Sequence, residues 1–397
     1  MENMEKVVYL DNAATTACAP EALEMMVKAL SGACGNPSSH YSVGYEAKEL
    51  VDTGRAQVAK AINATPAEIF FTSCGSEADN WAVKGTAFTK ARQNKKHLIT
   101  SAFEHHAIMH SMAALERMGF EVTYIKPTTE GYIRPEDVEA AIRPDTALIS
   151  IMMANNEIGT VEPVAQIGAI CKEKGIYFHT DAVQAVGHLP INVKEQNIDM
   201  MSASAHKFHG PKGVGFLYAR KGILLSNIIE GGAQERGKRA GTENIPAIVG
   251  MAAALKDVLA HQKENAEKMT ALRDRLIEGL LTIPHSKLNG DRTKRLPGNV
   301  NFCFEGIEGE SLLLMLDMKG IAASSGSACT SGSLDPSHVL LAIGLPHEIA
   351  HGSLRLTLNE EITKEDIDYV VDQLKTIVSD LRGMSPLYED FAKKQNK

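Results

Sequence analysis

Between about residue 44 and residue 220, short apolar runs alternate with longer segments of helical period, and this alternation constrains the fold more than any other feature. The helical segments include AKELVDTGRAQVAKAIN and SEADNWAVKGTAFTKA, and the apolar runs are EIFFTS, HLITS, EVTYIKP, TALISIMMA, IYFHTDA and VGFLYA. Several runs are apolar throughout, which is typical of strands in a sheet that helices cover on both faces. The pattern predicts an α/β domain with a doubly wound, mixed but mainly parallel sheet.

A second, smaller unit is predicted after a long helical stretch, roughly Ile245 to Leu281. Beyond this stretch lie the strand-like runs GNVNFCF and SLRLTL, a helix at ESLLLMLDM and a final helix that begins near Thr363. We therefore expect a large domain over residues 15–255 and a smaller α+β domain formed by residues 1–14 and 256–397. A chain of 397 residues, 44% of them hydrophobic, is long enough for two cores.

The charge balance, the N-terminus and the cysteines disfavour several classes of protein. The formal net charge is −8, which gives no reason to expect a nucleic acid or an acidic membrane as a partner. The N-terminus is acidic where a signal peptide would be basic, and no apolar stretch is long enough to span a bilayer. Because the six cysteines form neither C-x-x-C pairs nor a cluster, we expect separate thiols in a cytoplasmic protein.

Polar side chains follow five of the predicted strands at the point where each strand ends. Ligands of α/β sheets collect at the carboxyl ends of the strands, so we expect a site at this edge of the sheet. The segments are Cys74-Gly75-Ser76-Glu77, Glu104-His105, Asn155-Asn156-Glu157, Asp181-x-x-Gln184 and Ser202-x-Ser204-x-His206-Lys207.

Together, three of these features match the requirements of pyridoxal phosphate. A buried lysine such as Lys207 loses its proton readily and condenses with an aldehyde. Asp181 would keep a pyridinium nitrogen protonated, and Gly75-Ser76 at the start of a helix would seat a phosphate. Taken alone, each has an ordinary structural explanation, such as a surface lysine or a helix cap. Walker A and G-x-G-x-x-G spacings are missing, which disfavours nucleotide cofactors.

A series of motifs runs in order from YLDNAATT at Tyr9 to SLRLTLN at Asn359. They are GNPSS, FTSxxSEADN, EHHA, NNEIG, HTDAVQ, SAHKFHGPKG, RAGTEN and SSGSACTSG. On these motifs the chain resembles the cysteine desulfurases of the NifS/IscS kind, which are fold-type I pyridoxal phosphate enzymes of the class-V aminotransferase family.

The resemblance implies roles around the ring of the cofactor. Lys207 would carry pyridoxal 5'-phosphate as a Schiff base and, with His105, would act in catalysis. Asp181 would pair with the pyridine nitrogen, and His105 would stack on the ring. Gln184 and Asn156 would reach the phenolate oxygen or the substrate.

The resemblance also implies a phosphate site, which would be held by Gly75, Ser76, Ser204 and His206. A threonine from the second subunit completes this site in the family, and that position falls on Thr242, so a homodimer is implied. Ser76 stands where threonine is usual but keeps the hydroxyl. Cys74 stands where many relatives have glycine, and we interpret it as structural.

Cys329 lies in SSGSACTSGS, whose other nine residues are all Ser, Gly, Ala or Thr. Such residues bury too little area to offset chain entropy, so we expect a mobile loop over about residues 323–335. The resemblance implies that the Cys329 thiolate takes sulfur from L-cysteine, leaving L-alanine and an enzyme persulfide. The sulfur would pass to an acceptor protein such as an iron–sulfur scaffold. Arg355, with its planar fork, would bind the substrate carboxylate.

Alternatives within the same fold are a selenocysteine lyase and an aminotransferase, and a non-enzymatic sulfur-relay scaffold is a third. An aminotransferase has no need of a loop thiol, whereas a desulfurase depends on Cys329. PHEIAH contains the H-E-x-x-H spacing of zinc proteases, at His347, Glu348 and His351. Pro346 and Gly352 confine it to little more than one turn, so we expect no metal site there.

Overall fold

The central sheet of the larger body has seven strands in the order β2-β8-β7-β6-β5-β3-β4. The structure, a computed structural model, describes residues 7–32, 35–326, 336–385 and 388. Strand β8 runs antiparallel to both of its neighbours and the other pairs are parallel, which confirms the predicted mixed, mainly parallel sheet. The strands are β2 (Ile69–Thr72), β3 (His97–Ser101), β4 (Glu121–Ile125), β5 (Thr146–Ser150), β6 (Tyr177–Asp181), β7 (Met200–Ser204) and β8 (Gly215–Ala219).

Helices cover both faces of this sheet. Leu98, Leu148 and Leu217 pack into one core with α3 (Gly75–Ala91) and α4 (His106–Arg117). Their neighbours Ile99, Ile149 and Phe216 pack into another core on the opposite face. Successive strand residues point to opposite faces, so a sheet covered on both sides needs apolar residues at every position. The helices of the second face are α2 (Ser42–Ala61), α5 (Pro135–Ala140), α6 (Val164–Lys174) and the first part of α8 (Ile245–Leu281).

The smaller body contains an antiparallel sheet in the order β12-β10-β9 and a parallel pair, β1 with β11. Helices α9 and α12 pack on it around Phe302, Leu354 and Leu374. This arrangement confirms the predicted α+β unit. Its elements are β1 (Val8–Tyr9), β9 (Ser286–Leu288), β10 (Asn299–Phe304), β11 (Ile321–Ala322), β12 (Ser353–Thr357), α9 (Gly309–Asp317) and α12 (Lys364–Gly383).

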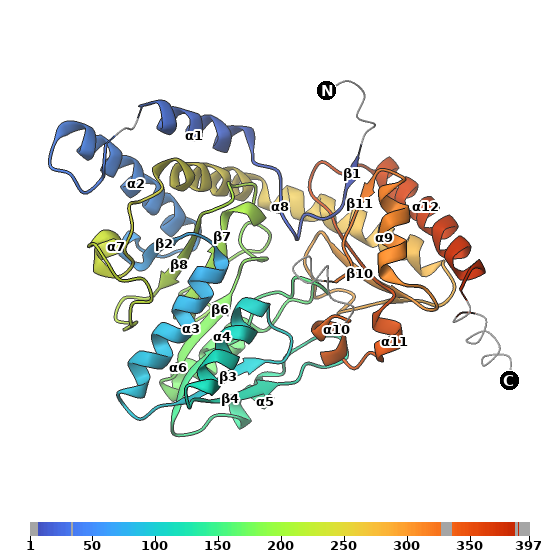
Figure 1. Cartoon of the computed structure of the whole chain (residues 1–397), viewed down its shortest axis with the longest axis horizontal. Coiled ribbons are helices and arrows are strands. Elements are labelled where there is room, and N and C mark those ends of the chain that lie inside the picture. The colour runs from blue at the N-terminus through green and yellow to red at the C-terminus, as the bar shows by residue number, and fades with distance from the viewer. Residues whose placement is uncertain (1–6, 33–34, 327–335, 386–387, 389–397) are drawn as a thin grey trace.

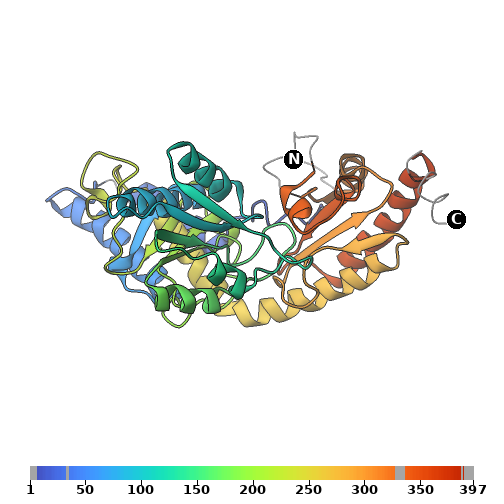
Figure 2. The same ribbon diagram turned by 90° about the horizontal axis from the view of Figure 1, so that it is seen from below.

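Helix α8 joins the two bodies and has the predicted bounds (Figures 1 and 2). It supplies Leu255 to the core of the larger body and Leu276 to the core of the smaller one. Leu10, near the N-terminus, also lies in the smaller core. The division into residues 15–255 and 1–14 with 256–397 stays a prediction, which this change of core supports.

The remaining elements are short, apart from α1, and lie at the periphery or beside the site. Among the described helices, none combines the length and apolarity that a bilayer span requires. The elements are α1 (Pro20–Gly32), η1 (Pro66–Glu68), η2 (Ala205–Lys207), α7 (Gln234–Gly237), α10 (His338–Ala342) and α11 (His347–Ala350). Helix α11 holds part of the H-E-x-x-H motif and, as expected, is only one turn long.

Candidate active site

A cavity of about 200 Å³ lies beyond the ends of β6 and β7, and it is lined by the turn before α3 and, from the smaller body, by Arg355. Every predicted site residue that the structure describes, except Thr242, lines it. The lining residues are Ala13, Ala14, Cys74, Gly75, Ser76, Asp79, His105, Met152, Ala154, Asn156, Asp181, Val183, Gln184, Ser204, His206, Lys207 and Arg355.

Lys207 enters the cavity from η2, the single turn that follows β7. Its ammonium group donates hydrogen bonds to the backbone carbonyls of Ala13 and Ala14. Gln184 donates to the same Ala13 carbonyl, at 2.9 Å. The N-terminal segment therefore fixes two predicted site residues, although the sequence analysis assigned it no part in the site.

Asp181 ends β6, and its Oδ1 accepts a hydrogen bond from the Val183 backbone N–H at 2.9 Å. Burial raises the pKa of Asp181 to about 6, although the Val183 N–H and the nearby Lys207 oppose that rise. An anion is therefore available at this position near neutral pH, as a carboxylate that pairs with a pyridinium nitrogen requires.

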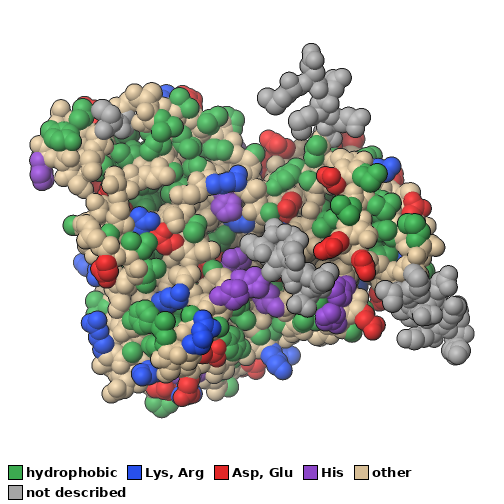
Figure 3. Space-filling model, viewed as in Figure 1, with side chains coloured by type: hydrophobic (Ala, Val, Ile, Leu, Met, Phe, Trp, Pro, Cys, Tyr) green, Lys and Arg blue, Asp and Glu red, His purple; other side chains and the backbone are tan. Residues whose placement is uncertain are grey.

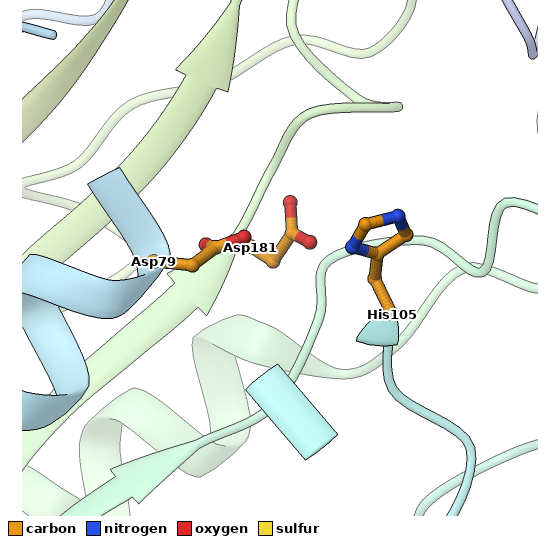
Figure 4. A group of neighbouring side chains, drawn as sticks. All are labelled: Asp79, His105 and Asp181. Atoms are coloured by element: carbon orange, nitrogen blue, oxygen red, sulfur yellow. The ribbon is translucent and has the colours of Figure 1, made fainter. Parts of the chain in front are cut away.

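His105 caps the N-terminus of α4 and faces Asp181 across the cavity (Figure 4). Its Nδ1 accepts the Ala107 backbone N–H at 3.1 Å, which leaves the proton of the neutral ring on Nε2. Burial and the nearby Lys207 lower the pKa of His105 to about 4. The imidazole is thus neutral at pH 7 and suited to stacking on an aromatic ring or to carrying a proton.

The start of α3 has the features of an anion seat. A Cβ atom on Gly75 would lie 2.6 Å from Cγ2 of Val183, so the backbone comes closer to its neighbour than other residues permit. The buried Ser204 hydroxyl has no hydrogen-bond partner within the described part of the chain. An unpaired hydroxyl beside the positive end of a helix fits a phosphate group. The cavity therefore fits pyridoxal phosphate at both its phosphate and its ring nitrogen.

Arg355 reaches the cavity from β12 of the smaller body and is 1% exposed. One of its terminal nitrogens donates to the Asn156 carbonyl at 3.1 Å, and the other pairs with Asp11 at 2.9 Å. Its buried Nε has no hydrogen-bond partner among the described residues. This unpaired donor fits a substrate carboxylate. Sequence reasoning missed Asp11, although the YLDN motif contains it.

Two further lining residues were missed or interpreted differently. Asp79 lies one turn after Ser76 on α3, and it had a signal in the FTSxxSEADN motif, whose helical spacing places both residues on one face. Cys74, interpreted as structural, precedes the first residue of α3 and also lines the cavity.

Cys329 lies outside the described residues, as does most of the predicted loop 323–335. The residues that flank the undescribed segment both approach the buried Glu157, which follows Asn156. Ser337 donates a hydrogen bond to Glu157 Oε2, and a Cβ on Gly326 would lie 3.3 Å from the same atom. Histidine side chains gather on this face (Figure 3); the rings of His106 and His338 are 4.6 Å apart.

Thr242 is exposed and does not line the cavity of its own chain. It follows Arg239, which forms two hydrogen bonds to Glu77 near the start of α3, at 2.8 and 3.0 Å. Within one chain, the geometry gives Thr242 no contact with the candidate phosphate seat.

The chain is similar to known proteins over most of its length. The family model for aminotransferase class-V matches residues 8–370. A cysteine desulfurase IscS of Clostridium botulinum (strain Hall) is 55% identical over 397 residues, covering 99% of this chain and all of that protein. A solved NifS-like protein aligns with a TM-score of 0.89 and 38% identity, over 95% of this chain and 100% of that one. A structure of SspA in complex with cysteine aligns with a TM-score of 0.80 and 37% identity, over 89% and 99%.

Proposed function

Since the chain belongs to the class-V aminotransferase family, we propose for it the reaction of its full-length cysteine desulfurase relatives. The protein is a pyridoxal phosphate-dependent cysteine desulfurase that converts L-cysteine to L-alanine and retains the sulfur for transfer. The observation that carries this proposal is the meeting of Lys207, Asp181 and His105 with Arg355 in one cavity. These residues supply, in one place, what the cofactor and an amino-acid substrate require.

The residues of the large sheet would bind the cofactor and move protons. When bound, pyridoxal phosphate supplies an electron sink that weakens the Cα–H bond of L-cysteine. Asp181 would hold the ring nitrogen, and Gly75, Ser76, Ser204 and His206 would hold the phosphate. Lys207, released from the cofactor by the substrate amine, would take the Cα proton and later return a proton to carbon, with His105 as its neighbour.

Arg355 and Cys329 would act on the substrate. Arg355 Nε would bind the substrate carboxylate and so fix the orientation of the substrate in the cavity. The Cys329 thiolate would attack the substrate sulfur, forming an S–S bond as the C–S bond breaks. The electron pair of the C–S bond goes to carbon, which a proton then completes as L-alanine. The enzyme keeps the sulfur as a persulfide, and no outside oxidant is needed.

The test is incubation of the purified protein with L-cysteine, with assay of alanine and mass measurement of the peptide that contains Cys329. We expect one added sulfur atom on that peptide. The Cys329→Ser variant should bind the cofactor normally, as judged by its visible absorbance, but form no persulfide. A variant that still produced alanine at the wild-type rate would contradict Cys329 as the sulfur acceptor. Transfer of the amino group with the sulfur left on the keto acid would instead favour an aminotransferase.

A homodimer would complete the site. Thr242 is exposed and does not line its own cavity, and α1 and α2 expose the apolar side chains Leu23, Leu30 and Tyr45. We infer that these helices contact a second copy and that Thr242 enters the partner's phosphate seat. Mixing Thr242→Ala and Lys207→Ala subunits should create one intact site per mixed dimer. Activity that stayed at the sum of the separate variants would contradict this arrangement.

The destination of the sulfur and the location of the protein are further proposals. The relative named IscS and the motifs of the chain support an acceptor protein such as an iron–sulfur scaffold. Four cysteines of the described residues, Cys18, Cys74, Cys171 and Cys303, are free thiols, which supports a reducing, cytoplasmic location. Co-purification of the chain with a scaffold that accepts labelled sulfur would test the first proposal.

A further inference from the structure

Asp79 is a second buried carboxyl group beside Asp181, and the proposed mechanism gives it no role. Helix α3 carries it one turn after the phosphate seat, where it is 1% exposed. One oxygen of Asp79, one of Asp181 and a ring nitrogen of His105 all lie within 4.8 Å of one another, with Asp181 in the middle (Figure 4).

Two carboxylates this close and this buried repel each other, so the pair retains a proton that an isolated carboxyl would lose. Asp181 is the better anion because it accepts the Val183 N–H and lies near Lys207. Asp79 Oδ1 has no hydrogen-bond partner among the described residues. Burial first, and then Asp181, raise the pKa of Asp79 well above its usual range, and they outweigh a hydrogen bond from the Ser202 hydroxyl that lowers it. The proton therefore rests on Asp79.

The other groups around Asp79 do not offer it a positive charge. His179 Nε2 lies 3.7 Å from Asp79 Oδ1, but burial lowers the pKa of His179 to about 3 and keeps the ring neutral. The His179 nitrogens pair with the hydroxyls of Ser150 and Ser202, each at 2.9 Å. His105, also near Asp79, is neutral at pH 7 because burial lowers its pKa to about 4. The acids Glu104 and Cys74 raise the pKa of Asp79 further.

We propose that Asp79 is a positioning residue: a neutral carboxylic acid that donates a hydrogen bond to Asp181 and holds it as the carboxylate facing the cofactor's ring nitrogen. The pair then carries one negative charge against the one positive charge of the pyridinium. An ionised Asp79 would add a second buried charge without a counterion. The inference rests on the proposed function, because it assigns the ring nitrogen to Asp181.

The test compares Asp79→Asn, which stays neutral and keeps hydrogen-bonding capacity, with Asp79→Leu, which has neither oxygen nor amide. The infrared difference spectrum between wild-type and Asp79→Asn holoenzymes at pH 7 should show the loss of a carboxylic-acid C=O band. Loss of a carboxylate band instead would overturn the proposal. Glu77→Gln, on the same helix, serves as the matched control. Although burial opposes it, hydrogen bonds from Arg239 and Ser73 lower the pKa of Glu77, so this variant should lose a carboxylate band and no C=O band.

Kinetics provide a second readout. Asp79→Leu should lower kcat about tenfold with little change in KM, and should release the cofactor about tenfold more readily, because the Asp181 carboxylate loses a donor. Asp79→Asn should restore most of both losses. Equal losses in the two variants would overturn the proposal, since a merely structural side chain would not distinguish them.

Two controls distinguish a protonated Asp79 from a missing cofactor and from a bound metal ion. Visible absorbance reports cofactor loading independently, so a chain that binds no pyridoxal phosphate contradicts the proposed function, while the infrared band still reports the protonation of Asp79. A divalent cation held by Asp79, His105 and Asp181 would also neutralise the carboxyl pair. Stoichiometric metal in the purified holoenzyme would therefore overturn the proposal.

Discussion

The two walls of the cavity are built in different ways. The larger body supplies the cofactor wall from the ends of neighbouring strands, with Lys207 and Asp181 carried on adjacent segments of one sheet. The smaller body supplies Arg355, which is tied back by the Asn156 carbonyl and by Asp11, and the N-terminal residues Ala13 and Ala14. The cofactor wall is thus preorganised by a continuous sheet, whereas the substrate wall depends on how the two bodies meet.

This difference teaches where each kind of perturbation should act. A change in the cofactor wall should lower the rate of the chemical step, because the groups there would touch the reacting atoms or the cofactor. A change in the substrate wall weakens binding and leaves the chemical step nearly intact. The expected effects below fall in that order.

The largest effect is expected for Lys207→Ala. Removal of the amine that binds the cofactor and moves the proton should lower alanine formation at least about a thousandfold. Borohydride should no longer link the cofactor to the chain, as mass measurement would show. A variant that retained more than a tenth of the wild-type rate would contradict the conclusion that the cofactor wall, unlike the substrate wall, carries out the chemical step.

A smaller loss, confined to binding, is expected for Arg355→Lys. Lysine keeps the charge but not the planar fork, so KM for L-cysteine should rise about tenfold to a hundredfold while kcat changes little. Steady-state kinetics provide the measurement. Arg275→Lys is the matched control, because Arg275 forms an exposed pair with Asp368 on the same body. An equal fall in kcat would place Arg355 at the reacting atoms instead.

The third effect is a change with pH in the free energy of unfolding, and it arises from a histidine buried in the large sheet. Burial lowers the pKa of His179 to about 3 from its usual 6.5, so the unfolded chain binds a proton below pH 6.5 that the folded chain rejects. The stabilising contribution is complete above pH 6.5 and is lost as the pH falls toward 3. Between pH 6.5 and 5, wild type should lose about 2 kcal/mol more than His179→Gln in urea unfolding.

The smallest effect is expected for Asp11→Asn. Asparagine retains an acceptor for Arg355 but loses the charge, and the Asp11 side chain is 18% exposed. KM should therefore rise only about threefold. An increase as large as that of Arg355→Lys would mean that the support of the guanidinium by Asp11, rather than its planar fork, controls substrate binding.

Much of the fold was predictable because helical periods and apolar runs within short stretches of the sequence determine its helices and strands. Helix α8 has the bounds that its helical period predicts, and β10 and β12 lie where the apolar runs place them. Strand β7 was not among the six apolar runs, since two of the five residues in its Met-Met-Ser-Ala-Ser sequence are polar, and its burial comes from lying between β6 and β8.

The chemical groups of the site were also readable from the chain, since polar residues after consecutive strands must meet at one edge of the sheet. Contacts between side chains that are far apart in the sequence could not be predicted. Asp11 and Arg355 are 344 positions apart, and Asp79 meets Asp181 only because α3 packs against β6 and β7. Local preference encodes which residues form helices and strands, but strand order and the packing of bodies bring remote side chains together. Those arrangements depend on the free energy of the whole folded chain, which no short stretch contains.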